Sequence, residues 1–287
     1  MVELRRAAAG EEQAVSALWG RVFGDGEAFL TEFYRRCVPF ERMLVLEEDG
    51  VLRTILCAPD MIMRFPNGKS LRCGYMYALA TDPSVRGKGF GRDMMRYGEV
   101  YLKGRGADCA ILVPAEPSLF RFFDSLGYLP AFSHLRREIP GEQVAPTAEG
   151  IAPALPGEYN ALRRRWLAGR CYADCDDDLV GFQQYLSRDT GGDIYQLDLP
   201  GGAGCAAVEL DGDAAVVKEL LCASDDVDRA LAQVASRHPA DRYILRLPAW
   251  AQGPGERVLW GAVRWLYDRP SPWWPEGQDA YLGLGFD

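Results

Sequence analysis

The chain has 287 residues, of which 48% are hydrophobic and 25% charged, and its formal net charge is -9. This length allows two domains with their own cores, and the composition excludes an intrinsically disordered chain. The acidic balance argues against general nucleic-acid binding, which rewards clustered Lys and Arg, and no apolar run is long enough to span a bilayer.

Hydrophobic periodicity in the first half predicts alternating strands and helices. The expected elements are a strand at 2–8, helices at 10–23 and 29–34, strands at 42–48, 51–64 and 71–80, a helix after a glycine loop at 86–91, a strand at 109–113, a helix at 116–127 and a strand at 128–139. Within this series, Pro66-Asn67-Gly68 predicts a hairpin turn.

The second half repeats part of this order after a segment at 141–156 that is rich in Pro, Gly and Ala. We predict a domain at 1–140, a linker at 141–156 and a diverged duplicate of the first domain at 157–287. Helices are expected at 158–170, 177–187 and 227–237, with strands at 194–199, 206–210, 214–222 and 243–247. Five of the seven tryptophans follow Pro248, and we expect them to form a packed aromatic cap rather than a binding platform.

Eight cysteines are scattered through the chain, mostly inside apolar runs, which indicates buried thiols in a reducing compartment. Cys171 and Cys175 form the one close pair, and a single C-x3-C is weak support for zinc, so no metal is expected. The N-terminus lacks the apolar core of a signal peptide, and we expect a cytoplasmic protein.

The most informative motif is the run from Arg86 to Gly91, RGKGFG, which opens an amphipathic helix after a strand and a turn at Pro83. The first N–H groups of a helix are unpaired and lie at its positive end, so they suit a diphosphate, and glycines let the backbone approach closely. The spacing matches neither the Walker loop nor the G-x-G-x-x-G dinucleotide fingerprint. A glycine-rich turn without a ligand is the remaining alternative.

The loop and its flanks resemble the acetyl-CoA-binding half of the GNAT superfamily of N-acetyltransferases. Arg86 to Gly91 meets that family's Q/R-x-x-G-x-G/A signature, and the residues 77–83 are similar to its fourth strand. The residues 109–113 are similar to its fifth strand, and 119–128 resembles the helix that ends in "FYxxxGF".

This resemblance implies an α/β (α+β) fold with a mixed, mainly antiparallel sheet flanked by helices, followed by a second, smaller GNAT-like domain. It implies acetyl-CoA as cofactor, with the pantetheine arm lying in a splay between two strands and backbone N–H groups holding the pyrophosphate. The implied cofactor-binding residues are Leu79, Ala80, Thr81, Arg86, Gly87, Lys88, Gly89, Phe90, Gly91 and Phe123.

The catalytic residues depart from the family pattern because Phe123 stands where the family carries a tyrosine that acts as general acid. Tyr75 and Tyr77 are the first candidates to replace it, and Glu116 is a candidate base, although core packing and helix capping explain these residues as well. Further candidates are Ser118, Tyr128, His134 and Cys73.

The second half carries Ala223-Ser224-Asp225-Asp226 where the first carries its glycine loop, and this negative charge would repel a pyrophosphate. We therefore expect one acetyl-CoA per chain. The expected activity is transfer of an acetyl group to a primary amine of a small molecule or peptide, with a homodimer left open. The alternatives are a non-catalytic acetyl-CoA-binding or sensing protein and a ligand-free structural protein.

Overall fold

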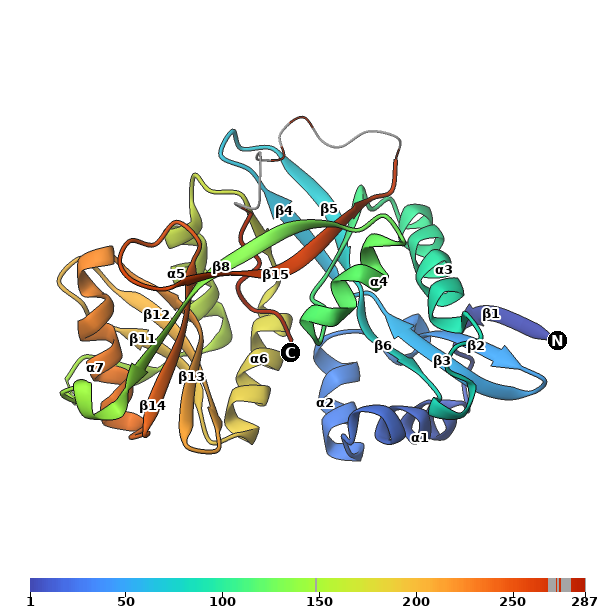
Figure 1. Ribbon diagram of the computed structural model, residues 1–287, viewed down its shortest axis with the longest axis horizontal. Helices are drawn as coiled ribbons and strands as arrows, with labels where there is room; N and C mark the ends of the chain where they lie inside the picture. Colours follow the sequence, from blue (N-terminus) through green and yellow to red (C-terminus); the bar gives the residue numbers. More distant parts are fainter. Residues whose placement is uncertain (148, 268–271, 273, 275–279, 287) are drawn as a thin grey trace. The chain divides into compact units, whose positions relative to one another are not determined.

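The computed structural model describes residues 1–147, 149–267, 272, 274 and 280–286, and the chain divides into two compact units (Figure 1). The first unit consists of 1–63, 70–129 and the described part of 262–272, and the second consists of 64–69, 130–261 and the described part of 273–287. Each unit is therefore discontinuous in sequence, and the segment 141–156 lies inside the second.

The described part of the first unit contains four α-helices, seven strands that lie in it wholly or for the most part, and the end of an eighth strand. In chain order they are β1 (Val2–Arg6), α1 (Glu12–Phe23), α2 (Glu27–Arg36), β2 (Leu44–Glu48), β3 (Val51–Cys57), β4 (Asp60–Arg64), β5 (Ser70–Tyr75), β6 (Tyr77–Thr81), α3 (Phe90–Gly104), β7 (Cys109–Leu112), α4 (Phe120–Asp124) and the end of β15 (Glu256–Trp265). These strands form two groups, ordered β1-β2-β3-β6 and β4-β5-β7-β15.

Three details differ from the elements expected from sequence. The strand expected at 51–64 is divided into β3 and β4 around Pro59, whose carbonyl accepts the N–H of Tyr75 at 2.9 Å. The strand expected at 71–80 is divided into β5 and β6, because its two parts pair with different strands. The helix expected at 116–127 begins with a 3-10 turn at Pro117–Leu119, and only Phe120–Asp124 is α-helical.

Helix α3 packs against the sheet of the first unit through an apolar face that includes the buried Phe90, Met94 and Leu102. Gly98 permits this close approach, because a Cβ there would lie 2.6 Å from Met76 Cε and 2.7 Å from Leu56 Cδ2. The helix is thus held next to the place where β5 gives way to β6.

The second unit contains the remaining helices and strands. They are β8 (Leu129–Pro140), β9 (Ile151–Pro153), α5 (Pro156–Leu167), β10 (Tyr172–Asp174), α6 (Asp177–Asp189), β11 (Asp193–Leu197), β12 (Gly204–Asp211), β13 (Ala214–Leu221), α7 (Val227–Arg237), β14 (Arg242–Pro248) and the first part of β15. Within the described part of this unit, neighbouring strands run in the order β15-β8-β14-β13-β12-β11-β9.

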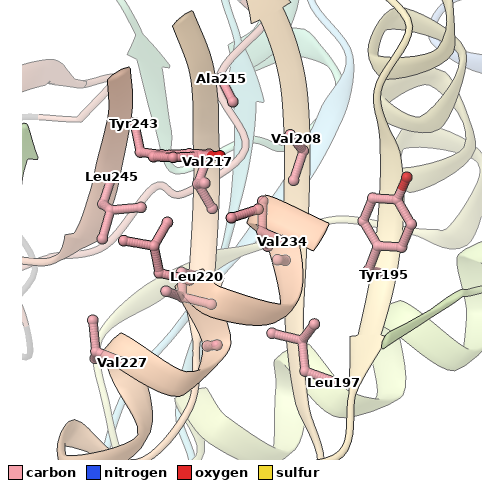
Figure 2. Close-up of a cluster of buried hydrophobic side chains, with 14 of the residues drawn as sticks. Tyr195, Leu197, Val208, Ala215, Val217, Leu220, Val227, Val234, Tyr243 and Leu245 are labelled. Carbon is pink, nitrogen blue, oxygen red and sulfur yellow. The ribbon is translucent and has the colours of Figure 1, made fainter. Parts of the chain in front are cut away.

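One face of this sheet is covered by α7, and Figure 2 shows their apolar side chains meeting. Val227 and Val234 of α7 belong to one buried cluster with Val217 and Leu220 of β13 and Leu245 of β14. In the sequence α7 connects β13 to β14, and these two strands pair in parallel. The three elements therefore form a β-α-β crossover.

β15 was not among the elements expected from sequence. It carries Trp260 and Trp265 of the expected aromatic cap, and Ala262 to Trp265 pair antiparallel with β7. Trp273, another member of that cap, lies outside the described residues. The predicted fold class is confirmed: the described residues form a mixed α/β structure with largely antiparallel sheets and seven flanking α-helices.

Candidate functional site

The first unit contains a splay between two strands. β5 pairs in parallel with β7 from Cys73 to Tyr75, and the N–H of Met76 donates to Ile111 O at 2.8 Å. The chain then enters β6, which pairs antiparallel with β3 and is the edge strand of its described sheet. The edge of β6 toward β7 therefore has backbone groups available for an extended ligand.

A β-bulge lies in β6 just beyond the point of divergence. Ile55 of β3 is paired with Ala80 and Cys57 with Tyr77, so β6 has one residue more than β3 in this interval. Ala78 within it has φ of 56°. Bulges change the direction of backbone and side-chain groups and are frequent next to active sites.

The glycine loop leads from β6 into α3 and leaves the start of the helix open. Gly87 and Gly89 have φ of 85° and 92°, and no atom lies within 4 Å of a Cβ placed at either residue. Gly89 is the N-cap, no side chain caps the helix, and the first helical bond runs from Asp93 N to Gly89 O. The N–H groups of the residues 90–92 therefore have no intrahelical acceptor.

Two of the predicted cofactor-binding segments, the end of β6 and the glycine loop, lie next to each other at this helix start. A Cβ at Gly91 would lie 3.5 Å from Thr81 Oγ1, so the end of β6 and the first turn of α3 are adjacent. Arg86 is exposed, whereas Lys88 Nζ is 3.0 Å from Glu48 Oε1. Uncapped donors, positive φ and open space fit the diphosphate of CoA, which remains a prediction for these residues.

Phe123 is buried in the core of the first unit, and its side chain has no hydroxyl that could donate a proton. Its ring centroid lies 5.1 Å from that of Phe122 and 6.0 Å from that of Tyr128. Tyr128 is also buried, and burial together with the nearby carboxylate of Glu99 raises its pKa well above 10. Its hydroxyl therefore lies beside a side chain of α3, within the packed core.

Tyr75 and Tyr77 lie on either side of the strand break with their rings stacked, 5.7 Å apart and 19° between planes. Tyr75 is only 1% exposed, whereas Tyr77 is partly exposed and also contacts Trp19 of α1 and Phe33 of α2. Burial raises the pKa of Tyr77 well above 10, and Tyr75 adds to this effect. Tyr77 therefore keeps its hydroxyl proton at neutral pH and is a weaker acid than a free tyrosine.

The remaining candidates are scattered. Glu116 is exposed before the 3-10 turn, where Ser118 Oγ donates to its Oε2 at 3.2 Å. Cys73 is buried beside Cys109, and burial raises its pKa well above 9, which makes it a poor base. His134 belongs to the second unit, where it is buried with its ring 5.1 Å from that of Trp260.

Two features of the site could not be recognised from sequence. The strand break at Met76 interrupts a continuous apolar run, and the bulge contains alanine rather than glycine at a positive φ, so neither has a local signal. Among the described residues, no three His, Cys, Asp or Glu side chains gather as a metal site would require, and no described helix is long and apolar enough to cross a membrane.

Comparison with known proteins finds a family match for the first part of the chain. The residues 3–131 match the acetyltransferase (GNAT) domain family. No curated protein matches the sequence. The fold is similar to solved GCN5-related N-acetyltransferases from Kribbella flavida (TM-score 0.67, 16% identity, covering 93% of this chain and 72% of that one) and Anabaena variabilis (0.70, 17%, 93% and 73%).

It is also similar to Eis1 from Mycobacterium abscessus, with a TM-score of 0.65 and 17% identity over 93% of this chain and 74% of that one. At these identities the solved structures establish the fold alone. The residues 3–131 form a domain that matches the acetyltransferase (GNAT) family.

Proposed function

We propose that the first unit transfers an acetyl group from acetyl-CoA to a primary amine. The observation that carries the proposal is that an open strand splay and an uncapped helix start occur together in one β-α-β crossover. The match of the residues 3–131 to the acetyltransferase (GNAT) domain family supports the same activity. When bound, acetyl-CoA would supply a thioester as the acyl donor.

The backbone would do most of the binding. The N–H groups of the residues 90–92 would hold the pyrophosphate at the positive end of α3, and the free edge of β6 would orient the pantetheine arm. A backbone N–H near the Ala78 bulge would polarise the acyl carbonyl, because a fixed dipole in a site that excludes water needs no reorganisation.

As the amine nitrogen bonds to the acetyl carbon, the C–S bond of the thioester would break and the CoA thiolate would need a proton. We assign the role of the general acid that supplies it to Tyr77 rather than Tyr75. Both rings lie at the strand break, but Tyr77 is the one that is partly exposed. An amine must lose a proton to react, and we assign this step to a water relay or to the exposed Glu116. The acceptor class remains a small-molecule or peptide amine.

The assignment is tested by release of free CoA thiol from acetyl-CoA in the presence of a panel of primary amines. Tyr77→Phe should lower kcat by about 100-fold or more, as loss of a general acid does, while the affinity for CoA stays within about twofold. Tyr75→Phe is the matched control and should leave kcat within about threefold, and Glu116→Gln tests the base in the same assay.

The rival is a protein that binds acetyl-CoA without catalysis, and Phe123 is the observation that favours it. Calorimetry with CoA distinguishes the two together with the thiol assay. Binding with turnover of at least one amine supports the enzyme, binding with no turnover across the panel supports the rival, and absence of binding overturns both.

A further inference from the structure

The residues 280–286 are buried in the second unit although they form neither a helix nor a regular strand. Their apolar side chains are between 1% and 5% exposed, and these are Ala280, Tyr281, Leu282, Leu284 and Phe286. Irregular segments usually lie at the surface, because a buried backbone needs hydrogen-bond partners. The groups that receive this segment must therefore supply both apolar contacts and hydrogen bonds.

The backbone of this segment adds to the strand β10 in the manner of an extended peptide. The N–H of Tyr281 donates to Cys171 O at 2.9 Å, and the N–H of Ala173 donates to Tyr281 O at 2.8 Å. Tyr281 is thus bridged in parallel to Tyr172 of β10. Addition of an extended segment to a strand is a recurring mode of peptide recognition, in which the backbone provides affinity and side chains provide specificity.

A buried ion pair holds the middle of the segment. Arg163 of α5 and Glu219 of β13 have side chains 1% and 0% exposed, and Arg163 Nε lies 3.1 Å from both carboxylate oxygens. The same guanidinium donates from Nη2 to Ala173 O at 3.0 Å and to Leu282 O at 3.2 Å. Arg163 therefore joins α5, β13, β10 and the segment 280–286.

Gly283 fits against this ion pair because it lacks a side chain. Its φ is 67°, and a Cβ there would lie 2.2 Å from Glu219 Oε1 and 3.1 Å from Arg163 Nη2. Glu219 has little freedom to move aside, since Arg163 engages both of its oxygens and Tyr159 Oη donates to Oε2 at 3.0 Å. A larger residue at position 283 therefore conflicts with the docked segment, both sterically and through its backbone.

Aromatic side chains anchor the segment at both ends. The ring centroid of Phe286 lies 5.4 Å from that of Phe182 of α6, and the ring centroid of Tyr281 lies 5.5 Å from that of Trp250. Both contacts are edge-to-face, which favours defined positions of the rings. Two aromatic anchors, buried leucines and a glycine at one fixed place form a pattern that a site can recognise in a peptide.

We infer that the residues 280–286 are a strap that can leave its site as a unit, and that the site then binds an extended peptide of the same chemistry. The strap site consists of Arg163, Ala173, Phe182, Glu219 and Trp250. Isolated bridges at Ala280 and Tyr281, rather than a continuous ladder, join the strap to its neighbours. Such a segment can open locally while the pairing of β11, β12 and β13 is retained.

The strap and its site belong to the second unit, so this inference does not depend on the proposed acetyl transfer.

Calorimetry with a synthetic peptide of the strap sequence, AYLGLGF with both ends blocked, tests this inference on the full chain. Gly283→Val should release the strap, and the variant should then bind the peptide with a Kd of about 10 µM. The wild type should bind it about 100-fold more weakly, because its own strap competes at an effective concentration of about 1 mM. A peptide with valine in place of its first glycine should bind neither protein.

The matched control is Gly212→Val in the turn between β12 and β13. Gly212 also has a positive φ, 58°, but no atom lies within 4 Å of a Cβ placed there. This variant should bind the peptide as weakly as the wild type does. Hydrogen exchange at the amide of Ala173, which donates to Tyr281 O, should be slow in the wild type, fast in Gly283→Val and slow again when the peptide is added.

Leu284→Glu is a second way to release the strap, because it places a charge on a side chain that is 2% exposed, and it serves if Gly283→Val does not fold. Circular dichroism checks folding. Absence of peptide binding to the folded variant, equal binding of the valine-containing peptide, or equally tight peptide binding by the wild type would overturn the inference.

Discussion

The two β-α-β crossovers of the chain, β5/β6–α3–β7 and β13–α7–β14, share a backbone plan. In each, a parallel strand pair ends partway along, and a β-bulge lies in the chain just beyond the last paired residue, at Ala78 in the first and Lys218 in the second. The duplication expected from sequence stays a prediction. Their chemistry differs because different groups occupy corresponding places.

The helix starts show the difference most clearly. α3 begins at a glycine without a side-chain cap, so its first N–H groups remain available. α7 is preceded by Asp226, a buried carboxylate that accepts the N–H of Gly201 at 2.8 Å. Neither helix has a side-chain cap, but α7 has a carboxylate at its N-cap position where α3 has a glycine. A carboxylate at this position disfavours an anion, whereas a glycine leaves room for one.

The largest effect is expected from Gly89→Val at the start of α3. A β-branched residue at φ of 92° is strained, and its side chain would enter the open space beside the first N–H groups. The affinity for CoA, measured by calorimetry, should fall about 100-fold, as loss of two charge-assisted hydrogen bonds would produce.

Gly104→Ala, in open space at the other end of the same helix, is the control and should bind CoA normally. Unchanged affinity in a folded Gly89→Val protein would show that the helix start does not hold the cofactor.

The bulge of the first unit is tested by Ala78→Val. Ala78 is buried at φ of 56°, and a larger β-branched side chain should destabilise the first unit by about 2 kcal/mol through backbone strain and overpacking. Urea unfolding followed by circular dichroism measures this change. Ala78→Gly relieves the strain and should stay within about 1 kcal/mol of the wild type, so equal losses in both variants would exclude strain as the cause.

The carboxylate before α7 should have a structural role. Asp226→Ala leaves the N–H of Gly201 without its acceptor and should destabilise the second unit by about 1–2 kcal/mol in urea unfolding. The neighbouring Asp225 is exposed, so Asp225→Ala should change the free energy of unfolding little. The stoichiometry of CoA binding should remain one per chain in Asp226→Ala. A second binding event would contradict a purely structural role for Asp226.

The smallest expected effect is on the pH dependence of the stability of the second unit. Burial, together with Arg237, lowers the pKa of His238 below 6.5, and its Nε2 lies 2.7 Å from Tyr195 Oη. The unfolded chain thus binds a proton more readily than the folded one, so this contribution to stability is present above about pH 6.5 and is lost as pH falls. The thermal midpoint should fall less between pH 7.5 and 5.5 in His238→Gln than in the wild type. Identical pH dependence would refute this role.

Local signals were sufficient for most elements and for the glycine loop. The helix 227–237 and the strands around it follow from hydrophobic periodicity, and the RGKGFG run combines glycines at positive φ with a helix start. The candidate catalytic residues are harder to rank, because Tyr75 and Tyr77 lie in the same apolar run of the sequence. Their different exposure depends on tertiary packing, in which Tyr77 contacts Trp19 of α1 and Phe33 of α2.

The sequence by itself determined the order of strands and helices, the glycine at the start of α3 and the carboxylate at the start of α7, since each depends on φ, charge and periodicity within a few residues. Only the tertiary structure decided the pairing of β15 with β7, the division of β5 from β6 and the docking of the residues 280–286 against Arg163. These contacts join residues far apart in the chain, and strand pairing depends on neighbouring strands and burial that no local pattern specifies.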